Sequence, residues 1–213
     1  MQTTFPRLML KHAAERPSAP ALREKEYGIW QTITWSGLAT LVQSVACGLH
    51  QAGLQRGEHL IVVGSNRPRL YATMLAAQSL GAIPVPLYQD AAAAECVFPI
   101  TNAEVRFAVV EDQEQVDKML EVREQCPQLT HIYYDDPRGL RKYTEDGLGS
   151  LEELIAAGGV FAKQHPQFFS EEVDKANWTD VAAMFFTSGT TGNPKGVVHT
   201  HSSLIDLADA GAE

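Results

Sequence analysis

The stretch MFFTSGTTGNPKGVV, residues 184–198, decides the interpretation of the chain. It opens as an apolar run, passes into a loop of glycine and hydroxyl side chains, and returns to an apolar pair. Residues 181–186 predict a buried strand, because they are continuous, apolar and suited to a pleated surface. The sequence therefore places a strand directly before a loop of unusual composition.

The loop combines four hydroxyl side chains, three glycines and one lysine, and each type has a physical use. Glycine lets backbone N–H groups approach a ligand closely, and successive inward N–H groups form a concave anion site. Hydroxyl groups donate to phosphate oxygens or ligate a phosphate-bound Mg²⁺, and lysine adds a compact positive charge. These features predict a loop that holds a polyphosphate. The plain alternative is a surface turn rich in glycine, threonine and proline.

Two common phosphate loops do not fit this segment. A Walker A loop reads G-x-x-x-x-G-K-[ST], whereas here Gly189 and Gly192 are too close together and Lys195 precedes Gly196. The dinucleotide fingerprint G-x-G-x-x-G is absent as well. The pattern that matches, at residues 187–196 and without a departure, is T-S-G-[ST]-T-G-x-P-K-G. The segment resembles the phosphate loop of the adenylate-forming superfamily: acyl-CoA synthetases, luciferases and peptide-synthetase adenylation domains.

The resemblance implies a ligase that uses ATP, Mg²⁺ and CoA. In such a reaction a carboxylate attacks the α-phosphate of ATP, and CoA then displaces AMP from the acyl-adenylate to form a thioester. The loop would hold the β- and γ-phosphates while charge moves onto the leaving pyrophosphate. The implied site residues are Thr187, the hydroxyl donors Ser188, Thr190 and Thr191, the backbone donors Gly189 and Gly192, and the cation Lys195.

Outside the loop, apolar runs of strand length alternate with stripes at helical spacing, which predicts an α/β fold with a mainly parallel sheet flanked by helices. Expected helices cover residues 5–15, 36–51, 68–80, 91–102, 112–124 and 151–157, and expected strands cover 21–23, 29–35, 59–63, 83–87, 105–110 and 131–134. The strand at 29–35 alternates like a hairpin arm. Ser36 is the expected N-cap of its helix, Pro99 predicts a kink or an early end, and Gly158-Gly159 is expected to close the last helix. Residues 135–149 are expected to form an exposed loop.

Sequence blocks that are less specific than the loop signature extend the resemblance over almost the whole chain. Residues 21–23, 34–35, 53–58, 80–82 and 84–88 are similar to recurring blocks of acyl-CoA synthetases, and the excursion between 110 and 181 is most like bacterial long-chain fatty acid ligases. The resemblance implies that residues 1–213 are an incomplete, N-terminal part of the AMP-binding domain, without a separate second domain. The family's later motifs would supply the adenine pocket, the Mg²⁺-binding acid and the catalytic lysine. We therefore expect a truncated fold, no catalytic residue in this chain, no ligase activity, and weak ATP binding at best.

Composition limits the partners. The formal net charge of −9 and the lack of a basic stripe disfavour nucleic acid. Cys47, Cys96 and Cys126 form no C-x-x-C motif, which favours buried free thiols in a reducing cytosol. The uncharged residues 70–89 are divided by one glycine and two prolines, so a helix and a strand are favoured over a membrane span. We expect a cytoplasmic protein that binds a carboxylic acid and CoA, with no transmembrane segment and with peripheral membrane association left open. Apolar faces left exposed by truncation predict a homo-oligomer.

The sequence also allows other interpretations. His199 and His201 suggest a metal pair, but a third ligand is lacking, so no metal site is expected and a place at the strand-to-helix junction is favoured. A phosphotransferase or NTPase of another class would need an acidic residue after a strand and a different loop spacing. A non-catalytic nucleotide-binding or interaction module derived from such a ligase stays open.

Overall fold

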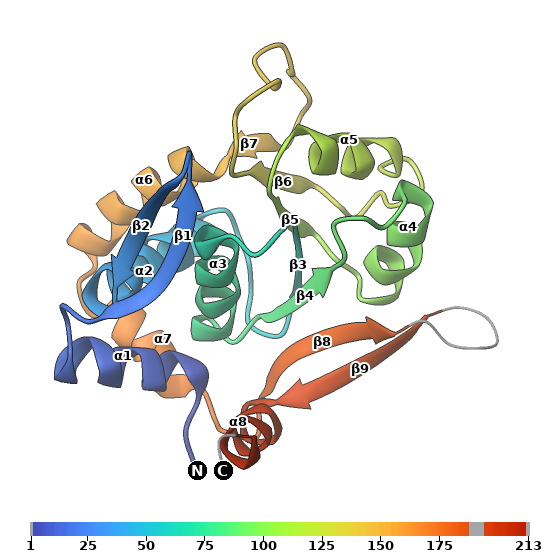
Figure 1. The fold of residues 1–213 in the computed structure, drawn as a ribbon. Helices are drawn as coiled ribbons and strands as arrows, with labels where there is room; N and C mark the ends of the chain where they lie inside the picture. The colour runs from blue at the N-terminus through green and yellow to red at the C-terminus, as the bar shows by residue number, and fades with distance from the viewer. Residues whose placement is uncertain (1, 188–193, 212–213) are drawn as a thin grey trace.

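The computed structural model describes residues 2–187 and 194–211, and Figure 1 shows their arrangement. At its centre lies a five-stranded sheet in the order β4-β3-β5-β6-β7, in which every neighbouring pair is parallel. Its strands are β3 (His59–Val63), β4 (Ile83–Leu87), β5 (Phe107–Val110), β6 (His131–Tyr134) and β7 (Leu148–Ser150). The prediction of a mainly parallel α/β sheet is confirmed.

Helices cover both faces of this sheet (Figure 1). On one face, five helices share an apolar cluster with Leu60 and Val62 of β3: α1 (Phe5–Glu15), α2 (Trp35–Gln51), α3 (Pro68–Ser79), α6 (Leu151–Gln164) and α7 (Phe168–Lys175). On the other face, α4 (Ala93–Asn102) and α5 (Gln113–Glu121) pack against Ile61 and Val63. Successive strand residues point to opposite faces, so a strand buried on both faces must be apolar throughout.

Two antiparallel hairpins flank the central sheet. The first pairs β1 (Pro20–Glu26) with β2 (Ile29–Thr34), as the alternation at residues 29–35 predicted. The second pairs β8 (Val181–Thr187) with β9 (Lys195–Thr200) and leads into α8 (His201–Ala210). Figure 1 shows this second hairpin below the sheet, extending away from α8.

The strand predicted at 181–186 forms, but the expectation that it is buried is wrong for its outer half. Ala182 and Ala183 are buried, whereas Phe185 is 36% exposed. The reason is that β8 has β9 as its hydrogen-bonded partner and belongs to a separate two-stranded sheet. Its outer half is therefore not covered on both faces.

The start of α2 differs from the prediction. Thr34, not Ser36, caps this helix, and its hydroxyl accepts a hydrogen bond from the N–H of Gly37 at 3.2 Å. Pro99 lies inside α4, which ends at Asn102 as expected, so the early end considered for this proline does not occur. The segment expected to be an exposed loop at 135–149 also departs from the prediction, because its last residues enter β7 and Leu140 is buried.

The glycines expected to end the sixth helix lie within it, since α6 continues to Gln164. A Cβ added at Gly158 would lie 1.9 Å from the carbonyl oxygen of Ser44 and 2.5 Å from the nitrogen of Gly48, both in α2. A Cβ added at Gly48 would lie 2.4 Å from the carbonyl oxygen of Leu154. The glycines therefore allow two helix backbones to touch.

The segment at residues 70–89 is divided between α3 and β4, as predicted. No helix within residues 2–187 and 194–211 is both long and apolar enough to cross a bilayer. Cys47, Cys96 and Cys126 are buried and free, and burial raises the pKa of the Cys47 thiol to about 11. These thiols behave as small apolar core groups.

The contact between α2 and α6 gives a matched pair of substitutions. Gly158→Ala is expected to lower the free energy of unfolding by about 1–3 kcal/mol, because the added methyl group meets rigid backbone. Gly159→Ala is expected to be neutral or to stabilise by up to about 1 kcal/mol, since its nearest atom is a side-chain oxygen 3.7 Å away. Urea unfolding followed by circular dichroism measures both. Equal midpoints for the two variants would show that the helices do not touch as described.

Candidate functional site

The two ends of the predicted phosphate loop meet across the second hairpin. Thr187, the last residue of β8, pairs with Lys195, the first residue of β9. Residues opposite each other in an antiparallel pair have Cβ atoms roughly 5 Å apart and share a face. Both residues are exposed. The pairing therefore places a hydroxyl group and an ammonium group side by side at the mouth of the loop.

The other predicted loop residues, Ser188, Gly189, Thr190, Thr191 and Gly192, lie outside the described residues. Their roles as hydroxyl and backbone donors remain predictions. The structure contributes the two strands that enter and leave the loop. These strands fix where the loop begins and ends.

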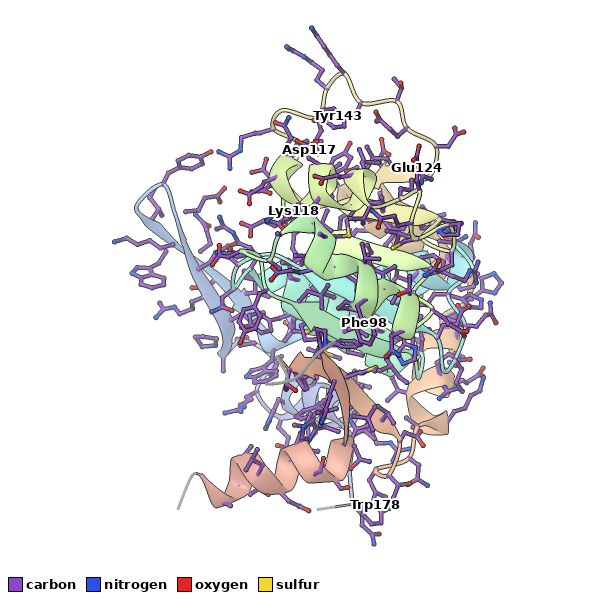
Figure 2. The ribbon with its side chains drawn as sticks, turned by 90° about the vertical axis from the view of Figure 1, so that its right-hand side faces the viewer. Phe98, Asp117, Lys118, Glu124, Tyr143 and Trp178 are labelled. Atoms are coloured by element: carbon purple, nitrogen blue, oxygen red, sulfur yellow. The ribbon has the colours of Figure 1, made fainter. Side chains whose placement is uncertain are left out.

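Hydrogen bonds hold the base of the hairpin, and an aromatic contact lies nearer the loop. The side-chain amide of Gln78 in α3 donates to the carbonyl oxygen of Ala182 at 2.8 Å. The backbone N–H of Ser202 donates to the carbonyl oxygen of Trp178 at 2.9 Å. Towards the loop, Phe98 of α4 meets Phe186 edge-on, with ring centroids 6.1 Å apart. Figure 2 shows Phe98 above the hairpin and Trp178 at its lower end.

The two histidines behind the loop have different surroundings. His199 lies in β9 beside Phe185, whereas His201 is the first residue of α8 and is buried. The N–H of Phe5 donates to Nδ1 of His201 at 3.3 Å, which joins the start of α1 to the start of α8. Burial lowers the pKa of His201 to about 4, and the charge of Asp180 only partly opposes this shift. His201 is thus a neutral structural acceptor at the strand-to-helix junction.

An apolar groove of about 480 Å³ runs between α1, α3, β4 and the base of the second hairpin. Its walls include Met9, Trp35, Met74, Leu75 and Phe185. Apolar side chains provide most of its lining, so it suits an aliphatic or aromatic group rather than a charged one.

A polar basin of about 550 Å³ lies at the carboxyl ends of β3, β5 and β6. Ser65 follows β3, Glu111 follows β5 and Asp135 follows β6. The chain leaves β3 towards one side of the sheet and leaves β5 towards the other. Open parallel sheets bind ligands at such a change of direction. Sequence reasoning missed this basin, although polar residues placed directly after strands were a usable signal.

Paired charges fill the basin. The carboxylate of Glu111 accepts hydrogen bonds from the N–H and hydroxyl of Ser65 at 2.6 and 2.7 Å and from Nε of Arg67 at 2.7 Å. Burial alone would raise the pKa of Glu111, but the bonds from Arg67 and Ser65 outweigh it and hold that pKa below its usual value. Arg67 also pairs with Glu24 at 3.6 Å. The network therefore joins the strand ends to the first hairpin.

A second arginine extends the same network. Arg69 pairs with Asp135 at 2.9 Å and also with Glu152 at the start of α6. Burial raises the pKa of Asp135, and Arg69 opposes that effect. Each of these arginines is shared between two carboxylates. Two arginines shared among four carboxylates leave no excess of positive charge in this network with which to attract an anion.

The sequence profile of the family described as AMP-binding enzyme matches residues 9–212. The chain belongs to this family. It is similar to the long-chain-fatty-acid–CoA ligase FadD15 of Mycobacterium bovis, with 24% identity over 198 residues. That match covers 93% of this chain and 31% of FadD15. The human long-chain-fatty-acid–CoA ligase ACSBG2 is 27% identical over 212 residues, covering 97% of this chain and 30% of ACSBG2.

The fold is also shared with solved structures. The N-terminal domain of FACL13 from Mycobacterium tuberculosis superposes with a TM-score of 0.77 at 24% identity, over 99% of this chain and 47% of that chain. The chain thus shares the fold of the N-terminal domain of FACL13. The chain spans about a third of the length of the curated relatives it matches.

The burial of His201 makes stability depend on pH. The pKa of His201 is about 4 in the folded chain and roughly 6.5 when unfolded. The unfolded chain therefore binds the proton more tightly. The stability that the neutral imidazole contributes is complete above about pH 6.5 and is lost as the pH falls towards 4. We expect His201→Gln to remove on the order of 2 kcal/mol of this pH dependence.

Urea midpoints measured from pH 7 to pH 4 test this prediction. His165→Gln, the same substitution at an exposed residue that follows α6, is the matched control for the change of side chain. Parallel profiles for wild type and His201→Gln would contradict the assignment of a buried neutral imidazole.

Proposed function

We propose that residues 1–213 act as the N-terminal part of the AMP-binding domain of an ATP-dependent carboxylic acid–CoA ligase. In its first step the carboxylate attacks the α-phosphate of ATP and releases pyrophosphate, leaving an acyl-adenylate. In its second step the thiol sulfur of CoA attacks the acyl carbon, AMP leaves and a thioester forms. Mg²⁺ accompanies ATP and neutralises part of the phosphate charge.

The observation that carries this proposal is the uninterrupted ten-residue signature, whose first residue pairs with its lysine across a hairpin. We assign Ser188, Thr190 and Thr191 as hydroxyl donors to the β- and γ-phosphates. Gly189 and Gly192 would add backbone donors. Lys195 would place its positive charge beside Thr187, where negative charge develops on the leaving pyrophosphate.

The substrate class we propose is a long-chain fatty acid. Two observations support it: the names of the relatives, FadD15 and ACSBG2, and the apolar groove beside β8. CoA is the second substrate. We further propose a cytoplasmic location, and self-association through the exposed apolar residues of the second hairpin, Val197 and Val198.

Lysine 195 provides the direct test of the loop assignment. In a ligase that joins residues 1–213 to the remaining length found in the relatives, Lys195→Ala is expected to slow ATP–pyrophosphate exchange about 10²- to 10³-fold. Lys175→Ala is the control, because Lys175 is an exposed residue of α7 paired with Glu172. Exchange that survives in Lys195→Ala at the control rate would defeat the assignment.

The chain of 213 residues by itself is expected to form no acyl-CoA and to bind ATP weakly. The chain spans about a third of its relatives, and we propose that the adenine pocket, the Mg²⁺-binding acid and the catalytic lysine come from outside it. Thioester formation with ATP, Mg²⁺, CoA and a panel of fatty acids measures this. Detectable acyl-CoA would contradict it. If the longer ligase also lacks pyrophosphate exchange, a non-catalytic nucleotide-binding or interaction module becomes the better interpretation.

A further inference from the structure

A second cavity adjoins the apolar groove at Phe185. It has a volume of about 620 Å³, and its lining includes Asn66, Leu87 and Tyr88, near the carboxyl ends of β3 and β4. The linings of the groove and of the second cavity share four residues, which are Tyr71, Met74, Pro86 and Phe185. These side chains therefore form the boundary at which the two spaces meet.

Strands β4 and β8 lie close together and arrange the two spaces in the same order (Figure 1). Along β4, Pro84 lines only the groove, Pro86 lines both spaces, and the residues that follow line only the second cavity. Along β8, Ala183 lines only the groove and Phe185 lines both. Thr187, at the mouth of the predicted phosphate loop, shares a face with Phe185 because alternate strand residues do so. The order towards the loop is therefore groove, Phe185, second cavity.

The two spaces differ in polarity in the order that a long-chain acid requires. The lining of the groove is mostly apolar, whereas the second cavity also has polar residues such as Asn66 and Asp90. The hydroxyl of Tyr71 donates to Oδ1 of Asn66 at 2.8 Å, so the polar end of this boundary residue is held by a residue of the second cavity. An acid whose carboxylate lies at the loop mouth would therefore extend through the second cavity and place its apolar end in the groove.

Phe185 is the boundary residue that β8 contributes, two positions before the loop mouth. Its side chain is 36% exposed, so close packing does not surround the ring on every side. The ring meets that of His199 edge-on, with centroids 5.7 Å apart. The size of the side chain at position 185 therefore sets how wide the passage between the two spaces is.

We propose that Phe185 is a specificity-determining residue that selects acyl chains by length. A short acid is held within the second cavity, whereas a long chain passes Phe185 and buries its far end in the groove. Each methylene group that becomes buried strengthens binding about four-fold, so affinity rises with chain length only while the passage beside Phe185 is open. This inference rests on the proposed function, because it takes a fatty acid as the substrate and places its carboxylate at the loop.

Displacement of a fluorescent fatty acid from the 213-residue chain tests the proposal without ATP or CoA. Octanoate, dodecanoate and palmitate are the competitors, and wild type should bind them more tightly in that order. Phe185→Trp narrows the passage, so it should weaken palmitate roughly sixteen-fold or more, the loss of two buried methylene groups, and should leave octanoate within about two-fold. Phe185→Ala widens the passage, so it should keep the ratio of palmitate to octanoate affinity at or above that of wild type.

Phe186→Trp is the matched control for the enlarged side chain. Phe186 points to the opposite face of β8, where it meets Phe98, and it lines neither the groove nor the second cavity. Its chain-length profile should equal that of wild type, and thermal unfolding reports whether each variant folds. Equal profiles for Phe185→Trp and wild type would overturn the inference. The same change in Phe186→Trp, a lower ratio in Phe185→Ala, or no fatty acid binding by the chain would also overturn it.

The ligase reaction is measured separately. ATP–pyrophosphate exchange by the longer ligase reports the proposed function, whereas displacement of the fluorescent fatty acid reports the passage beside Phe185. Normal exchange combined with an unchanged profile in Phe185→Trp would overturn this inference alone. Absent exchange combined with the expected profiles would overturn the ligase assignment and would support Phe185 as the length selector of a fatty acid-binding module.

Discussion

Burial of both faces of the five-stranded parallel sheet is the constraint on which the remaining structure depends. Parallel strands need long crossovers, and the crossover helices must cover the sheet. That arrangement brings the carboxyl ends of β3, β5 and β6 to one edge. Ser65, Glu111 and Asp135 meet there without being near one another in the sequence. The paired charges of the basin are therefore a consequence of the sheet.

The position of the first hairpin follows from the same edge. Arg67 lies at the start of α3 and pairs with both Glu111 and Glu24. The ion pairs at the strand ends therefore also hold the first hairpin in place. One ion-pair network thus connects the strand ends of the core sheet to the first hairpin.

Much of the fold could be predicted from the sequence, because β3, β4 and β6 are short apolar runs bounded by turn signals. What failed depended on tertiary contacts. Gly158 reads locally as a helix terminator, and only the nearby backbone of α2 explains why α6 continues through it. Thr34 and Ser36 are both good caps, and the local sequence does not decide between them. The exposure of Phe185 was missed because an apolar run looks the same whether one face or both are covered.

The sequence predicts which residues make up the candidate site. The pairing of β8 with β9 shows where the two ends of that loop lie. The base of this hairpin is held by Gln78, by the carbonyl of Trp178 and by the packing of His201, whereas the mouth at Thr187 and Lys195 is exposed. A triphosphate approaching a chain of net charge −9 gains little from long-range attraction, and beyond about 8 Å salt screens what exists. Binding of the triphosphate must then depend on hydrogen-bond donors that lie close to the phosphate oxygens. Under the proposed phosphate-binding role, hydroxyl groups, backbone amides and one lysine would supply such donors, which would account for the composition of the loop.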